Sequence, residues 1–528
     1  MSTEVVATYD HRAPRPIATR LIVTGTLHLL TPAHLGNGDA EAITDMPLLL
    51  DTVGDDPVPL LTGTSIAGAL RGYLLTRGQG YRAVEQRRSG QMAELLFGAV
   101  KGDDTGEQSP LIVDDALGVL RDTAALEVRD GVKINYATRT ADDRFKYDLE
   151  LLPAGTTFSL RFELLLPPIP TQARALRHAL AVALSGLSAE PGREHGDIFL
   201  GARRSRGFGR CVVSEWSYAE YELRDNIEGL LAWITAEHSG WAPGPTRIWQ
   251  GGPQAALGAG ETGSSATDAR RRFVIDGRFA LTSILVRSSD PLLPADELPD
   301  DTRRQLPDVT HIRSFRDENG MTAILPGTSL AGALRSRAAM ILATLAPNAE
   351  PRRQALLNSI FGFDMHRAAG GEAAPTASRL IVEERPIDLG QLLVQSRVAI
   401  DRFTGGAFET ALFSEAPWFG GAVQLHLTLH HDAIPSDPAT AEAQAAEEHA
   451  RIGLLLLLLK DLWSGDLPLG GSASVGRGIV RGIEADLKAD ADTQWHLRES
   501  DSGLLIEEQP AEALERYLQA LHTYLGLV

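Results

Sequence analysis

Residues 201–210 (GARRSRGFGR) have the composition of a loop that binds phosphate. Arginines can pair with successive phosphates, and glycines allow positive φ angles that turn several backbone N–H groups towards one anion. A second segment, GGSASVGRG, follows Leu469 and keeps the glycines but only one arginine. We therefore expect backbone amides to hold the anion; the alternative is a solvated turn with incidental arginines. The candidate anion-binding residues of the two loops are Arg203, Arg204, Arg206, Gly207, Gly209, Arg210, Gly470, Gly471, Gly476 and Arg477.

The two loops belong to a longer duplication. GTSIAGALR at residues 63–71 recurs as GTSLAGALR at 327–335, an offset of 264 residues. LFG, LIVDD and VKINYATRT in the first half match IFG, LIVEE and VAIDRFTGG in the second, in the same order. Such a repeat predicts two homologous domains. We place them at residues 1–241 and 270–528, joined by a flexible linker rich in Gly, Pro, Ala and Ser at 242–269.

Each copy has the same predicted order of elements. An alternating strand is followed by a helix that begins at GTS, then by two strands, a second helix, the glycine-rich loop and a closing strand. This β-α-β-β-α-β order resembles the ferredoxin-like arrangement that RNA recognition motifs also use, so the expected class is α+β. Thr64 or Ser65 and Thr328 or Ser329 are the predicted N-caps of the first helices.

The helix starts are a second candidate anion site, because helix N-termini attract negative charge. Ser65 and Ser329 would supply hydroxyl groups, and Arg71 and Arg335 follow one to two turns inside the helix. These arginines could reach a phosphate or, equally, a carboxylate. Plain helix capping is the alternative interpretation.

The composition restricts the function classes. The 528 residues carry a formal net charge of −19, so any surface that binds a polyanion has to be local. The single cysteine, Cys211, excludes an intramolecular disulfide and a zinc site built on several thiolates. P-loop, dinucleotide and G-x-S-x-G signatures are absent from the sequence. The leucine-rich run 453–459 is far shorter than the roughly 20 residues of a spanning helix, and we expect a cytoplasmic protein without membrane contact.

The succession of motifs resembles the RAMP superfamily. HLGNGD, ITDMPLLL, GTSIAGALR, LLFG, a basic hairpin-like insertion and a glycine-rich loop follow one another over most of residues 20–220, and the pattern returns over 272–485. Within that superfamily it is most similar to the backbone subunits that coat guide RNA in type III CRISPR effector complexes, and the tandem arrangement resembles type III-D. The resemblance implies a guide RNA, a single-stranded target RNA and other effector subunits, namely the large polymerase-like subunit and other backbone and small subunits, as partners.

The resemblance also implies one aspartate per domain that cuts the target RNA. Asp45 in AITDMPLLL holds that place in the first copy, with Asp39 as a rival, and Asp308 is the best match in the second, near Asp300 and Asp301. A carboxylate can orient the attacking 2′-hydroxyl or hold a divalent ion, Mg²⁺ or Mn²⁺, that stabilises charge on the phosphate. Magnesium suits a site with one protein carboxylate plus water and phosphate oxygens. The alternative is an ordinary loop aspartate.

The hairpin-like insertions match the place of a thumb that, in these subunits, wedges between nucleotides and flips one base out of the guide–target duplex. Phe403 is one aromatic residue that could stack there, and a surface hairpin with edge charges is the alternative. We weigh a slicing backbone subunit against a structural one with one or both sites silent. A third hypothesis is a guide-processing, metal-independent endoribonuclease that uses His28 or His34. The further residues expected to contact RNA are His34, Lys133, Arg139, Arg402 and Phe403.

Overall fold

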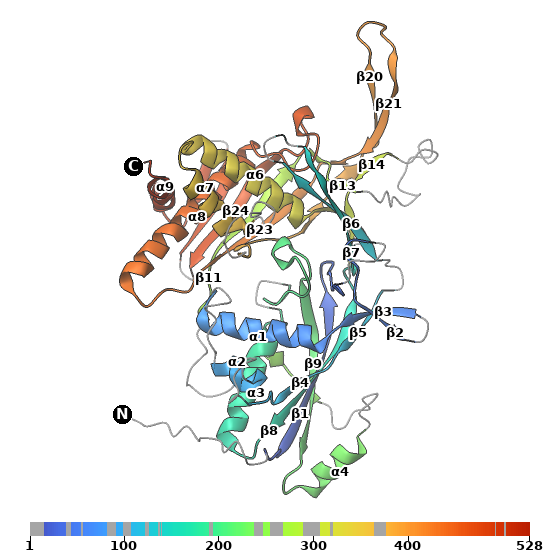
Figure 1. The fold of residues 1–528 in the computed structure, drawn as a ribbon, viewed down its shortest axis with the longest axis vertical. Helices are drawn as coiled ribbons and strands as arrows, with labels where there is room; N and C mark the ends of the chain where they lie inside the picture. The colour runs from blue at the N-terminus through green and yellow to red at the C-terminus, as the bar shows by residue number, and fades with distance from the viewer. Residues whose placement is uncertain are drawn as a thin grey trace.

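The structure, a computed structural model, folds into two related halves (Figure 1). Both halves combine antiparallel sheets with helices, which confirms a mixed α and β protein. No helix within the described ranges is long and apolar enough to cross a membrane. The structure describes residues 15–38, 44–53, 56–81, 91–98, 107–121, 126–135, 138, 140–189, 194–236, 247–253, 268–288, 307–316, 320–363, 376–490, 493–500 and 503–527.

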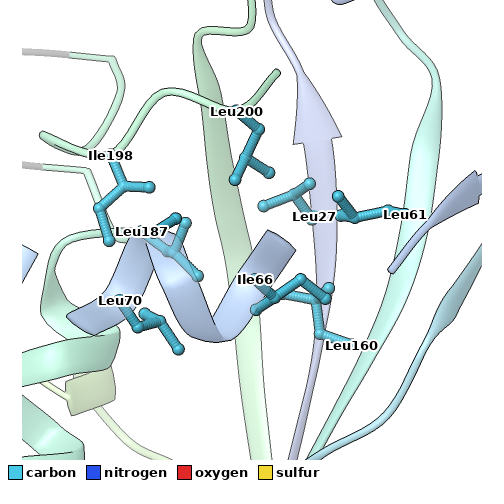
Figure 2. Close-up of a pocket in the computed structure, with 9 residues that line it drawn as sticks. Leu27, Leu61, Ile66, Leu70, Leu160, Leu187, Ile198 and Leu200 are labelled. Carbon is cyan, nitrogen blue, oxygen red and sulfur yellow. The ribbon is translucent and has the colours of Figure 1, made fainter. Parts of the chain in front are cut away.

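The first half is built around β1 (Thr19–Leu29), which pairs antiparallel with β8 (Thr157–Leu166) and β9 (Cys211–Glu222). Helix α1 (Gly63–Gln79) packs against this sheet through the apolar side chains in Figure 2, and the space between them has no room for a water molecule. The remaining elements are β2 (Leu50–Val53), β3 (Asp56–Leu61), α2 (Gln91–Phe97), β4 (Leu111–Val113), β5 (Ala116–Val119), α3 (Pro170–Ser185), α4 (Ile227–Thr235) and β10 (Arg247–Ile248).

The second half repeats this plan around β11 (Arg271–Leu281), which pairs with β23 (Ala422–His431) and β24 (Val480–Asp490). Its first helix, α6 (Gly327–Leu345), matches α1 in the repeat. The other elements are β12 (Ser283–Ile284), β15 (Arg313–Arg316), β16 (Gly320–Leu325), α7 (Glu350–Phe361), β17 (Leu380–Val382), β18 (Arg385–Asp388), β19 (Gln391–Leu392), β22 (Trp418–Phe419), α8 (Pro438–Ser464), β25 (Thr493–Ser500), β26 (Gly503–Glu507) and α9 (Glu512–Leu525).

The duplication extends to strand order and register. The order β9-β1-β8, with β4 on β8, matches β24-β11-β23, with β17 on β23. Each central strand also carries an irregularity against its closing strand, between Gly25 and Leu27 in the first half and between Arg278 and Phe279 in the second. The predicted N-caps were wrong, because Thr62 and Pro326 precede the helices as N-cap residues. Within the predicted linker, β10 at residues 247–248 pairs with β9.

A two-stranded hairpin extends from each half, where the sequence places the insertions (Figure 1). In the first half β6 (Glu127–Ile134) pairs with β7 (Ala141–Leu151). In the second half β20 (Gln395–Ile400) pairs with β21 (Ala407–Ala416), and this hairpin projects furthest from the body. The base of β21 also pairs with β14 (Val309–His311), which in turn pairs with β13 (Arg287–Ser288).

Candidate nucleic-acid interface

Asp45 lies exposed at the base of the first hairpin. Its Oδ2 accepts a hydrogen bond from the backbone N–H of Asp148 (3.0 Å), and the N–H of Met46 donates to the carbonyl of Asp148 (3.2 Å). Glu150, two residues further along β7, accepts from the Thr44 hydroxyl (2.8 Å) and the Leu48 N–H (3.0 Å). These contacts fix the loop before β2 against the hairpin and hold the carboxylate at the surface.

Asp308 has the same relation to the second hairpin. Its Oδ2 accepts from the N–H of Ser414 (2.7 Å), and Val309 pairs in parallel with Glu415, as Met46 does with Leu149. Asp308 is also exposed. The two aspartates therefore occupy equivalent positions in the two halves, while a role in cleavage stays a prediction. Asp39, Asp300 and Asp301 lie outside the described residues.

Charged and aromatic side chains surround Asp45. A hydrogen bond with Asp130 and the nearby negative charges raise the pKa of Asp148 above its ordinary value. Arg203 stacks on the ring of Tyr147, 4.4 Å from its centroid, and hydrogen-bonds the phenol oxygen. Lys146 Nζ lies 3.5 Å from Asp130. Groups of both signs of charge therefore lie beside Asp148, the residue whose N–H binds Asp45.

The surroundings of Asp308 are different. Ser414 stands in place of Asp148, and Ser472 in the second loop stands in place of Arg203. Beside Ser414, Glu415 pairs with Arg397 and Arg477, and its side chain is buried. The second site therefore keeps the aspartate geometry but lacks the acid pair and the stacked guanidinium.

The two glycine-rich loops have the same backbone. Each forms a short 3-10 turn, η2 (Arg204–Arg206) and η4 (Ala473–Val475), flanked by residues with positive φ. A Cβ atom on Gly209 would collide with the carbonyl oxygen of Leu200, and one on Gly478 with that of Leu469. The persistence of these glycines thus has a cause within the loop itself. It does not require a bound phosphate.

The structure buries two of the predicted RNA-binding arginines, Arg210 and Arg477, which does not fit the prediction that they face RNA, and Arg206 is partly buried against the second half. Arg206 donates to Ser378 Oγ (3.3 Å) in the second half, and burial, with the nearby Arg335, lowers the pKa of Arg206 to about 10. Arg210 lies 3.2 Å from Glu383, and burial lowers its pKa to about 10 as well. Arg477 is buried against Glu415. Two loop glycines that were also predicted to bind RNA, Gly207 and Gly209, are buried as well.

The remaining predicted contacts are divided between interior and surface. His34 is buried and its Nδ1 hydrogen-bonds the carbonyl of Glu150 (2.8 Å), so it is not placed to contact RNA or to transfer protons. Arg335 donates to the carbonyl of Gly362 (2.8 Å), which joins α6 to the end of α7. Arg139 lies outside the described residues. At least partly exposed are Ser65, Arg71, Lys133, Arg203, Arg204, Ser329, Arg402, Gly470, Gly471 and Gly476, and Phe403 is 100% exposed.

Metal binding at these sites would rest on few ligands. The described residues contain no group of three or more His, Cys, Asp or Glu side chains placed to hold a metal ion. Asp45 and Asp308 each offer one exposed carboxylate with one oxygen already hydrogen-bonded. This donor set fits Mg²⁺ only in the mode in which water and substrate phosphate supply the other ligands.

The ion pairs that join the halves are not predicted by the sequence pattern. Arg129 in β6 pairs with Glu127 (2.8 Å) and with Glu384 of the second half, and Arg316 also pairs with Glu384. Glu384 is the last residue of LIVEE, a motif used only to find the repeat. Two adjacent acidic residues after a buried strand were the available signal, but their partners are far away in sequence.

Comparison with known proteins agrees with this architecture. The family model of the RAMP superfamily matches residues 26–212 and residues 255–481, one region in each half and well over half of the chain. No curated protein matches the sequence. Because the matched regions cover well over half of the chain and include both aspartates and both glycine-rich loops, the chain belongs to the RAMP superfamily.

Proposed function

We propose that this protein is a backbone subunit of a type III CRISPR effector complex that binds guide RNA and cuts the paired target RNA once per half. Membership in the RAMP superfamily supports a CRISPR-associated RNA-binding subunit. We interpret each half as a ferredoxin-like unit with its hairpin as the thumb. In the second hairpin Phe403 is 100% exposed, in a turn held by the Asp401 carboxylate, which accepts from its N–H (2.8 Å).

The observation that carries the proposal is the equivalence of Asp45 and Asp308. Each is exposed at a hairpin base and held through one oxygen by a backbone N–H. A thumb that displaces one nucleotide would leave its phosphate beside this carboxylate. The free carboxylate oxygen can then orient the 2′-hydroxyl for attack. A bound Mg²⁺ would stabilise negative charge on the phosphate.

The experiment changes one carboxylate at a time. Asp45→Asn and Asp308→Asn keep the shape and an oxygen acceptor but remove the charge. With guide RNA and labelled complementary target in Mg²⁺, each substitution should remove one cleavage product and spare the other. Asp51→Asn is the matched control, because Asp51 is exposed and its Oδ1 accepts from a neighbouring N–H (2.7 Å). Wild-type cleavage in both aspartate variants, or loss of both products in either one, contradicts two independent sites.

A specific observation favours a second candidate, a backbone subunit that cuts only in its first half. Asp308 lacks counterparts of Asp148 and Arg203, as described above. In that case the wild type gives one cut, Asp45→Asn abolishes it, and Asp308→Asn changes nothing. RNA binding should survive in all three proteins.

A further inference from the structure

The contact between the halves shows how a glycine-rich loop of this fold docks onto the next domain. Arg206 enters a recess beside the N-terminus of α6 and donates to Leu380 O (3.3 Å) and Phe361 O (3.4 Å) as well as to Ser378. A Cβ atom on Gly207 would collide with the backbone of Glu384. The loop backbone therefore lies directly on the recess, and the guanidinium fills it.

The first half has the matching recess beside the start of α1, and no described residue fills it. It is an open depression of about 360 Å³. Ser109 Oγ donates to the carbonyls of Leu96 (3.0 Å) and Leu111 (2.7 Å). Ser378 makes the equivalent hydrogen bonds in the second half, so the groups that accept from Arg206 there have counterparts held in the same way here. The lining includes Phe97, Ser109 and Leu111, the counterparts of Phe361, Ser378 and Leu380.

The open recess shows what the docked loop covers in the second half. Val113 is partly exposed, whereas its counterpart Val382 is fully buried. Asp115 is exposed where Glu384 is buried between two arginines. Arg71 lines the recess and has no hydrogen-bond partner among the described residues. Among the described residues, part of the apolar wall and the Asp115 carboxylate thus remain exposed at the place where the second half receives a loop.

The glycine-rich loop of the second half docks on no other domain among the described residues. The turn η4 has the backbone of η2, but a Cβ atom on Gly476 would meet nothing within 4 Å. At the position of Arg206 this loop carries Val475, which is 60% exposed. A second copy of this chain therefore brings no guanidinium to the carbonyl acceptors of the open recess.

We propose that the recess at the start of α1 binds the glycine-rich loop of a different subunit of the same fold, one with an arginine at the position of Arg206. Val475 then prevents copies of this chain from stacking on one another through that recess. The proposal rests on the internal interface and needs no RNA. Its failure would leave the proposed cleavage function untouched.

The test is sedimentation velocity of the full-length chain without RNA. Val475→Arg should convert a monomer into dimers and longer species as the concentration rises. Ala473→Arg is the matched control: it adds the same charge to the same turn at the position of Arg204, which is exposed, and should stay monomeric. Adding Gly68→Phe to Val475→Arg should abolish assembly, because Gly68 lines the recess and a Cβ atom there meets nothing within 4 Å.

Three results would overturn the proposal. Val475→Arg sediments as wild type does, or it still assembles when Gly68→Phe blocks the recess, or the wild type assembles through the recess by itself. Thr64→Trp, at an exposed position of the same lining, repeats the block if Gly68→Phe folds poorly. A labelled single-stranded RNA serves as the competing probe. If Gly68→Phe weakens its binding while Val475→Arg stays monomeric, the recess is a nucleic-acid surface instead.

Discussion

Replacing Arg129 with methionine should weaken the junction between the first hairpin and the second half. Burial alone would lower the pKa of Arg129, but Glu384 and Glu127 outweigh it and raise the pKa, so the group is charged. Methionine keeps most of the volume but leaves Glu384, whose side chain is 0% exposed, with Arg316 as its remaining cation. Removing one partner of a buried ion pair costs about 3–5 kcal/mol. Because Arg316 remains, we expect the lower end, about 3 kcal/mol.

The assay is urea unfolding of the full chain followed by circular dichroism, with the two halves fitted as separate transitions. Arg498→Met is the control, because the Arg498–Glu507 pair (3.6 Å) is about half exposed and should contribute less than about 1 kcal/mol. An Arg129→Met protein that loses no more stability than Arg498→Met would refute the reasoning.

The pH dependence of the same variant provides a second readout. Burial would raise the pKa of Glu384, but Arg129 and Arg316 outweigh it and hold the pKa below its ordinary value. A carboxyl group with a lowered native pKa stabilises the fold above its unfolded pKa of about 4.3, and this contribution is lost as the pH falls through the native pKa. The stability difference between wild type and Arg129→Met should therefore be full at neutral pH and shrink in acid.

Two further predictions concern a loop glycine and the hairpin tip. An alanine in the left-handed conformation costs about 1–2 kcal/mol. Gly209→Ala should destabilise the fold by more than this, because its Cβ atom would also collide with Leu200, whereas Gly476→Ala should cost only the conformational amount. Equal thermal unfolding midpoints for the two variants would contradict this. Phe403→Ala should weaken binding of the guide–target duplex by about 1–3 kcal/mol without changing thermal stability. Filter binding measures the affinity, and Ile234→Ala, which removes an exposed apolar side chain on α4, is the control.

The sequence predicted the features that depend on local pattern and repetition. The repeat identified two halves, and the matched aspartates Asp45 and Asp308 occupy equivalent positions because each loop meets its hairpin in the same way. The fate of the loop arginines was beyond this kind of reasoning. Arg206 and Arg210 find their partners about 175 residues away, in segments whose proximity depends on how one half docks on the other. The sequence of an arginine-containing glycine-rich segment does not indicate whether its arginines face solvent or another domain.

One short turn connects the first candidate site to the second half. At one end of η2, Arg203 stacks on Tyr147 beside Asp45, and at the other end Arg206 is partly buried against the second half. The base of the first hairpin is tied to that half as well, through Arg129. The position of the first candidate site relative to the second half is therefore held by packed side chains. If both aspartates cut one RNA strand, we expect the spacing of the cuts to depend on this interface.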